Sequence, residues 1–94
     1  MQRPAATPTI QLDNDTVRVT EWRFAAGAET GWHTHAMPYV VVPMTTGPLL
    51  LETNEGEQTS QLTLGQAYFR PAGVKHNVIN PSDHEFVFVE TEIK

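Results

Sequence analysis

The stretch GQAYFRPAGVKHNVIN, residues 65–80, carries the clearest structural pattern in this 94-residue chain. Pro71 and Gly73 mark a tight turn, because proline presets one turn position and glycine accepts a positive φ angle. The segments on either side are short and rich in aromatic and β-branched side chains, which favour strands. The stretch therefore predicts two strands joined by a turn that carries His76 back toward the middle of the fold.

The same alternation of short strands and turns extends in both directions. Turn residues recur about every ten positions, and no stretch has the 3.6-residue period of a long helix. Asn54-Glu-Gly56 is a good hairpin signal. Nine short strands cannot stay as one flat sheet with exposed edges, so we expect an all-β sandwich or a small barrel with room for one small ligand. The expected strands cover residues 9–12, 17–24, 31–35, 39–43, 49–53, 58–62, 67–70, 74–79 and 85–93.

The chain contains no composition shift that would mark a domain boundary. We therefore expect one domain over residues 1–94. Residues 1–8 (MQRPAATP) hold two prolines and few large apolar groups, and they are expected to form an extended N-terminal lead. A chain this short buries a modest share of its surface, which favours a homodimer.

Composition limits the possible partners. The formal net charge is −5 and only six residues are Lys or Arg, so the basic patch that nucleic acids or anionic membranes require is lacking. No apolar run approaches a membrane span, and the N-terminus does not read as a signal peptide. The chain has no cysteine, which rules out a disulfide or thiolate site and fits the cytoplasmic location that we expect. A small molecule or another protein is the expected partner.

Three histidines are candidates for a metal site. In GWHTH, residues 31–35, His33 and His35 are two positions apart, and such residues point to the same face of a strand. His76 lies 41 residues beyond His35 and would add a third imidazole from a second strand. Neutral imidazole suits Zn, Fe, Ni, Cu and Mn, and three nitrogen ligands leave positions open for water or substrate. The alternative is that the three imidazoles are satisfied by hydrogen bonds alone.

The two histidine-bearing stretches together resemble the two sequence motifs of the cupins. The two motifs, with the residues between them, extend from Gly27 to Asn80 and cover more than half of the chain. The glutamate of the first motif is replaced by Tyr39, and the final glycine of that motif, Gly47, falls one residue late. YVVVP at 39–43 and EFVFVE at 85–90 are similar to small single-domain cupins (cupin 2 type) associated with β-alanine catabolism. The matching positions are Gly27, His33 and His35 in the first motif and Gly65, Pro71, Gly73, His76 and Asn80 in the second.

This resemblance implies a small jelly-roll β-barrel, frequent homodimers, and a divalent transition metal held by His33, His35 and His76. The leading hypothesis is a metal-dependent enzyme that acts on a small oxygen-rich molecule, with the metal as a Lewis acid. Tyr39 is the nearest candidate for proton transfer, but it could also be a ligand, a hydrogen-bond donor or an apolar wall. The alternative function is a non-catalytic small-molecule-binding or sensor protein, and a third is an empty barrel that serves as an interaction module.

The remaining aromatic residues are assigned by hydrophobicity. Phe69, Phe86 and Phe88 are expected in the core. Trp22 and Trp32 could belong to the core, the pocket wall or a dimer surface, and the sequence leaves these alternatives open.

The remaining charged residues are expected at the surface. His84 follows a turn and is expected to be exposed, while Glu29 is expected to be solvated or near the pocket mouth. Arg70 is expected to face solvent or a carboxylate; if it faces the pocket, it could hold a carboxylate substrate. Burying Glu90 and Glu92 would be costly, so we expect the last strand to leave the core near Glu90.

Overall fold

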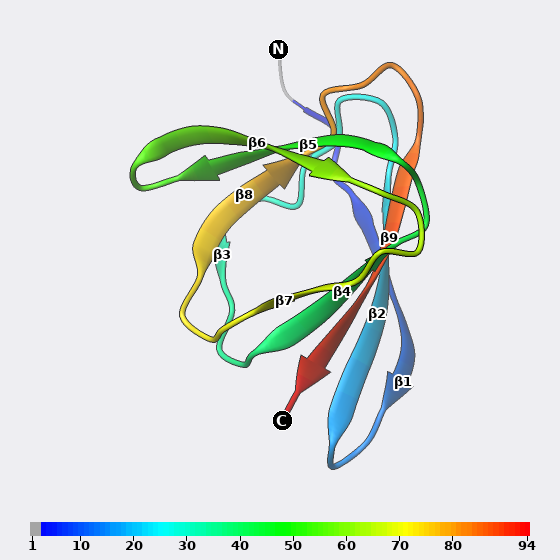
Figure 1. Ribbon diagram of the computed structural model, residues 1–94, viewed down its shortest axis with the longest axis vertical. Helices are drawn as coiled ribbons and strands as arrows, with labels where there is room; N and C mark the ends of the chain where they lie inside the picture. Colours follow the sequence, from blue (N-terminus) through cyan, green and yellow to red (C-terminus); the bar gives the residue numbers. More distant parts are fainter. Residues whose placement is uncertain (1–2) are drawn as a thin grey trace.

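The computed structural model describes residues 3–94, which form two antiparallel sheets packed face to face (Figure 1). One sheet has five strands in the order β1-β2-β9-β4-β7, and the other has four in the order β3-β8-β5-β6. The described residues contain no helix. They therefore include no helix that is long and apolar enough to cross a membrane. The strands are β1 (Thr7–Asp13), β2 (Val17–Phe24), β3 (His33–Thr34), β4 (Tyr39–Pro43), β5 (Gly47–Thr53), β6 (Gly56–Leu62), β7 (Tyr68–Arg70), β8 (Lys75–Ile79) and β9 (Phe86–Ile93).

This arrangement confirms the all-β jelly-roll expectation. Strands from opposite ends of the chain pair with each other: β2 lies between β1 and β9 in Figure 1, and Val17 and Phe24 are in register with Ile93 and Phe86. The two sheets do not close into one continuous barrel. A cavity between them is lined by residues of both sheets, and this is where the candidate site lies.

The turn chemistry accounts for most strand boundaries. β2 and β4 span the predicted residues, and the hairpin between β5 and β6 turns at Asn54-Glu55, with Thr53 paired to Gly56. β3 is shorter than predicted, at two residues, and β1 begins at Thr7 rather than at residue 9.

Ahead of β1 the chain lies against the loop that precedes β3. Ala6 N–H donates to the Glu29 carbonyl at 2.8 Å, and Glu29 N–H donates to the Pro4 carbonyl at 2.9 Å. Met1 and Gln2 of the expected lead lie outside the described residues. The N-terminal segment is therefore tied, from Pro4 onward, to the loop that leads into β3 and its histidine.

The core follows the two-residue period of the strands. Phe24, Phe86 and Phe88 are buried, and the rings of Phe24 and Phe88 pack with centroids 5.4 Å apart. This confirms the prediction for Phe86 and Phe88, but the prediction for Phe69 was wrong, because its side chain is 55% exposed. The central residue of a three-residue strand faces away from its two neighbours, and those neighbours, Tyr68 and Arg70, face the space between the sheets.

The last strand also departs from expectation. We predicted that it would leave the core near Glu90, yet Glu90 is 7% exposed and continues the inward row of Phe86 and Phe88. At Glu90 the inward-facing side chains of β9 line a pocket and are not exposed to solvent. The Glu90 carboxylate is therefore buried, but polar side chains as well as apolar ones surround it.

Candidate metal centre

The structure brings the three predicted histidines together in the lining of the cavity between the two sheets. His33 on β3 is in register with His76 on β8, and His35 follows β3 by one residue. The Nε2 atom of His35 lies 3.0 Å from Nε2 of His33 and 3.1 Å from Nε2 of His76. The three rings are mutually close to perpendicular, with interplanar angles of 79°, 73° and 89°. Three nitrogen atoms thus converge on one point from three directions.

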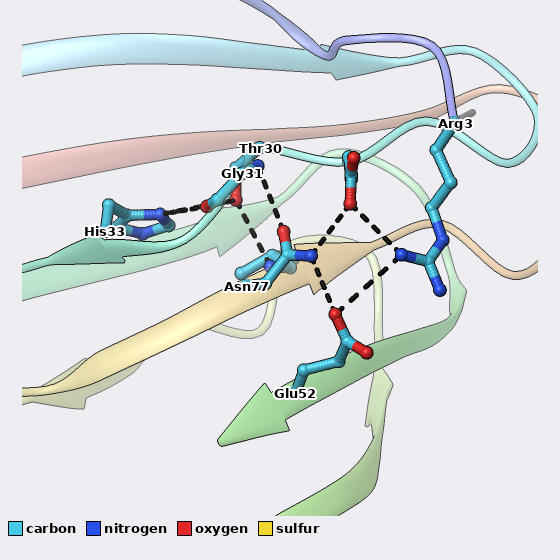
Figure 2. A network of polar contacts seen from close by, with 8 residues as sticks. Arg3, Thr30, Gly31, His33, Glu52 and Asn77 are labelled. Atoms are coloured by element: carbon cyan, nitrogen blue, oxygen red, sulfur yellow. Dashed lines mark hydrogen bonds and ion pairs between the residues drawn. The ribbon is translucent and has the colours of Figure 1, made fainter. Parts of the chain in front are cut away.

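His33 is oriented from behind by the backbone of its own loop. Its Nδ1 lies 2.8 Å from the Gly31 carbonyl oxygen and 3.3 Å from the Thr30 hydroxyl (Figure 2). A carbonyl oxygen only accepts, so Nδ1 carries the proton and Nε2 is left with a free lone pair. Gly31 has a φ of 86°, a left-handed conformation that glycine adopts without strain.

His35 is held by the turn that the sequence singled out. Its backbone N–H donates to Val74 O at 2.9 Å, and its carbonyl accepts from Gly73 N–H at 2.7 Å. Its ring stacks on Tyr39, with centroids 3.9 Å apart. Pro71 and Gly73 therefore position not only His76 but also the second histidine of the first motif.

The histidines are electrostatically suited to be metal ligands. Burial, reinforced by neighbouring imidazoles, lowers the pKa of both His35 and His76 to about 4. Both rings are therefore neutral near pH 7, as imidazole ligands must be. The Glu90 carboxylate lies 3.9 Å from His35 Nε2, but with a neutral imidazole this contact is not an ion pair at that pH.

The spacing of the three nitrogens fits a metal ion. Ligands at about 2.1 Å from a common centre, and separated by about 90° to 95°, would lie about 3.0 to 3.1 Å apart. The two Nε2 separations match this requirement. Such a facial set leaves the opposite side of the ion open, so the three residues could hold a metal and still bind a ligand.

A cavity of about 40 Å³ adjoins the three histidines. The four-stranded sheet supplies the histidines and apolar side chains such as Leu49, while the five-stranded sheet supplies a polar group of side chains. A cavity of this size admits a ligand of a few heavy atoms. The polar group comprises Tyr39, Tyr68, Arg70 and Glu90.

Tyr39 occupies the position of the missing motif glutamate. It is 3% exposed, and burial, followed by the Glu90 carboxylate, raises the pKa of its phenol above the usual value near 10. The phenol keeps its proton at neutral pH. It is therefore suited to donate a hydrogen bond and to support the His35 ring, and poorly suited to ligate a metal as phenolate.

Glu90 is the site residue that sequence reasoning missed. Burial, followed by the charge of Glu92, raises the pKa of Glu90 to about 7. The signal was available in the alternation of β9, which places Glu90 on the same face as Phe86 and Phe88. The cost of burial was the reason for discounting this signal, and the pocket reduces that cost.

Arg70 lines the cavity and also reaches solvent. Its guanidinium lies 4.5 Å from the centre of the Tyr68 ring and donates to the Phe69 carbonyl at 3.0 Å. Arg3, Arg18 and Arg23 all pair with carboxylates, but among residues 3–94 no carboxylate is paired with Arg70. The pocket is thus rimmed by a cation without an internal counter-ion.

The other candidates lie away from the cavity, with one exception. His84 is exposed as predicted, and Trp32 is 51% exposed, whereas Trp22 lines the cavity. Glu29 is neither fully solvated nor at the pocket mouth, because it accepts a hydrogen bond from Asn77 at 2.8 Å and pairs with Arg3.

Comparison with known proteins places this geometry in a family. The family model Cupin_2, described as Cupin domain, matches residues 20–92. The chain is 68% identical over 92 residues to the Beta-alanine degradation protein BauB of Pseudomonas aeruginosa, covering 98% of this chain and 97% of the relative.

Solved structures share the fold. A crystal structure of a cupin domain from Bordetella pertussis matches with a TM-score of 0.99 and 73% identity, over 100% of this chain and 98% of that one. A cupin superfamily protein from Desulfitobacterium hafniense has a TM-score of 0.73 at 13% identity, covering 99% and 81% of the two chains, which shows likeness of fold alone. The chain therefore belongs to the cupin family and is a small cupin similar to BauB.

Proposed function

We propose that this cupin is a metal-dependent enzyme that acts on a small oxygen-bearing carboxylate. The observation that carries the proposal is the convergence of three Nε2 atoms, 3.0 and 3.1 Å apart, at one end of a small cavity. The metal ligands in this proposal are His33, His35 and His76, and the metal is a divalent transition ion such as Zn, Fe, Ni, Mn or Cu.

The substrate class follows from the charges around the cavity. An M²⁺ ion held by three neutral imidazoles remains dicationic and favours an oxygen ligand that is anionic or chelating. Arg70, without a carboxylate partner among the described residues, offers a fork that matches a carboxylate. The name of the relative BauB points to β-alanine degradation, so we propose a short carboxylic acid formed in that breakdown as the substrate.

The protein residues have separable roles in this proposal. The bound metal would polarise an oxygen of the ligand as a Lewis acid. Arg70 binds the carboxylate, the phenol of Tyr39 donates a hydrogen bond to a ligand oxygen, and the buried carboxyl group of Glu90 holds or releases a proton at Oε1. Apolar side chains such as Leu49 and Val41 line the cavity and exclude bulk water.

A ligand screen tests the proposal. Protein purified without a nickel column is incubated with short hydroxy-, oxo- and amino-carboxylates, with and without Zn²⁺, Mn²⁺ and Fe²⁺. Thermal shifts identify binders, and NMR of the mixtures detects products. We expect a metal-dependent binder that is converted, and Arg70→Gln should weaken its binding about 10- to 100-fold. Arg18→Gln, which removes an arginine paired with Asp13, should leave binding unchanged.

The screen also separates the second candidate function. Replacement of the motif glutamate by Tyr39 removes a group that could take up a proton, and this favours a non-catalytic binding or sensor protein. A carboxylate that binds with metal and is recovered unchanged would support that alternative. Absence of any binder with metal present would contradict both.

We also propose that the protein is a homodimer and acts in the cytoplasm. The support for a dimer is the small core of a 94-residue chain together with the exposed apolar side chains Ile10 and Leu12 on the edge strand β1. The support for the location is the lack of cysteine in the sequence.

A further inference from the structure

Asn77 lies directly after His76 on β8 and points to the opposite face of that strand, away from the metal-site cavity. It is 2% exposed, so each of its polar atoms needs a partner. Its Nδ2 donates to Glu29 Oε1 and to Glu52 Oε1, both at 2.8 Å, and its Oδ1 accepts from Gly31 N–H at 3.0 Å (Figure 2). One buried amide thus joins β5, β8 and the histidine-bearing loop.

The orientation of this amide is fixed by charge. Both carboxylates can only accept hydrogen bonds when ionised, so the NH₂ group must face them. A flipped amide would place its oxygen against two carboxylates and its NH₂ against a backbone N–H. Arg3 lies behind the pair, 3.2 Å from Glu29 and 3.8 Å from Glu52, and offsets their mutual repulsion.

The other end of Gly31 leads to the metal site. Asn77 holds the N–H of this residue, and the carbonyl of the same residue lies 2.8 Å from His33 Nδ1. Thr30 reinforces the arrangement, because its hydroxyl donates to the Gly31 carbonyl at 2.9 Å and accepts from Val78 N–H at 3.1 Å. Gly31 has a φ of 86° and no side chain, so its position depends on its backbone hydrogen bonds and on Thr30, whose N–H also donates to the Val78 carbonyl at 2.9 Å.

We propose that Asn77 is a positioning residue for His33: clamped by Glu29 and Glu52, it holds Gly31 so that the Gly31 carbonyl fixes the ring and tautomer of His33. The proton is thereby kept on Nδ1, and the Nε2 lone pair is aimed at the point shared with His35 and His76. The importance of this clamp for metal affinity rests on the proposed metal site, but its effect on the tautomer does not.

The tautomer is measured in protein freed of metal with a chelator. Long-range ¹H–¹⁵N spectra of labelled protein at neutral pH distinguish a protonated Nδ1 from a protonated Nε2. We expect His33 in the wild type to be protonated at Nδ1, and Asn77→Leu to give a mixture of both tautomers. Zn²⁺ affinity, measured by chelator competition, should fall about 10- to 100-fold in this variant, as is typical when the outer partner of a ligand is lost.

Two further variants separate positioning from general damage. Phe86→Leu removes buried apolar volume from β9, which pairs with β2 and β4 and not with the strands of the clamp, and it should retain the wild-type tautomer and Zn²⁺ affinity within about twofold. If Asn77→Leu does not fold, the double variant Glu29→Gln and Glu52→Gln tests the two carboxylates that clamp Asn77. Both side chains are partly exposed, so we expect this variant to fold. This double variant should loosen the clamp. The fraction of His33 protonated at Nε2 should be smaller than in Asn77→Leu, and the Zn²⁺ affinity should fall about threefold or more.

The outcomes are distinguishable. A wild-type His33 protonated at Nε2, or clamp variants with an unchanged tautomer, would overturn the positioning role. If the tautomer changes as expected but the wild type binds no metal, the clamp stands and the proposed metal function fails.

Discussion

Glu90→Gln replaces a buried carboxyl group on β9 with an amide of nearly the same shape. In the folded protein, burial raises the pKa of Glu90 to about 7 from its ordinary value of 4.5. The folded state therefore binds this proton more tightly than the unfolded state. The stability associated with the protonated carboxyl group is fully present below about pH 4.5 and is lost as the pH rises through 7.

The size of the effect follows from the two pKa values. At about 1.4 kcal/mol per pKa unit, the interval between 4.5 and about 7 corresponds to about 3 kcal/mol in full. Between pH 5 and pH 8 the larger part of this, about 2 to 3 kcal/mol, should be lost by the wild type. Glutamine has no charge to bury, so the stability of Glu90→Gln relative to wild type should rise by that amount over the same range.

The assay is urea unfolding of metal-free protein at pH 5, 6, 7 and 8, followed by tryptophan fluorescence. His35 and His76, with pKa values lowered to about 4, make both proteins more stable as the pH rises from 4 to 6.5, and this contribution cancels in the difference. Glu57→Gln, at an exposed position on β6, is the matched control and should show a flat difference. A difference for Glu90→Gln that stays constant within about 0.5 kcal/mol would refute the burial argument.

Three further outcomes are expected. Zn²⁺ at a hundred times its Kd should stabilise the wild type by about 2.7 kcal/mol, and His76→Ala should lose this stabilisation. The measurement is the Zn²⁺-dependent shift in Tm. An undiminished shift in the variant would show that His76 is not a ligand. Tyr39→Phe keeps the ring that stacks on His35 and should cost much less stability in urea unfolding than Tyr39→Ala, for which about 3 to 5 kcal/mol is expected; equal losses would show that the hydroxyl, not the ring, stabilises the site. Light scattering at micromolar concentration should give twice the 10.5 kDa mass of the chain, whereas a monomer would contradict the proposed homodimer.

Local sequence signals predicted an all-β fold and the pairing of His33 with His35, whereas the jelly-roll architecture and the addition of His76 to the site came from the resemblance to the cupin motifs. The two-residue period and the turn residues located the strands, and β2 and β4 were predicted to the residue. His33 and His35 share a face for the same reason, and the turn at Gly73 determines where His76 returns. These features depend on a few neighbouring residues, which is why they can be read without the fold.

The errors concern the direction in which a side chain faces, which depends on pairing between distant strands. Phe69 is exposed and Arg70 lines the cavity because of the register of β7 with β4. Glu90 is buried because the sheets leave a pocket at its position rather than solvent. Hydrophobicity predicts the opposite for each of these residues, since a ligand-binding interior needs polar groups inside. Asn77 carried no local signal, because its partners come from residues 25 or more positions away.

The central claim is that the three histidines bind a metal ion. Elemental analysis of protein purified without a nickel column, before and after reconstitution with Zn²⁺, Mn²⁺, Fe²⁺, Ni²⁺ or Cu²⁺, tests it most directly. We predict close to one equivalent of a transition metal per chain, and its loss in His76→Ala. Less than about a tenth of an equivalent of every metal in the reconstituted wild type would contradict the account, since a formed three-nitrogen site should take up at least one of these ions.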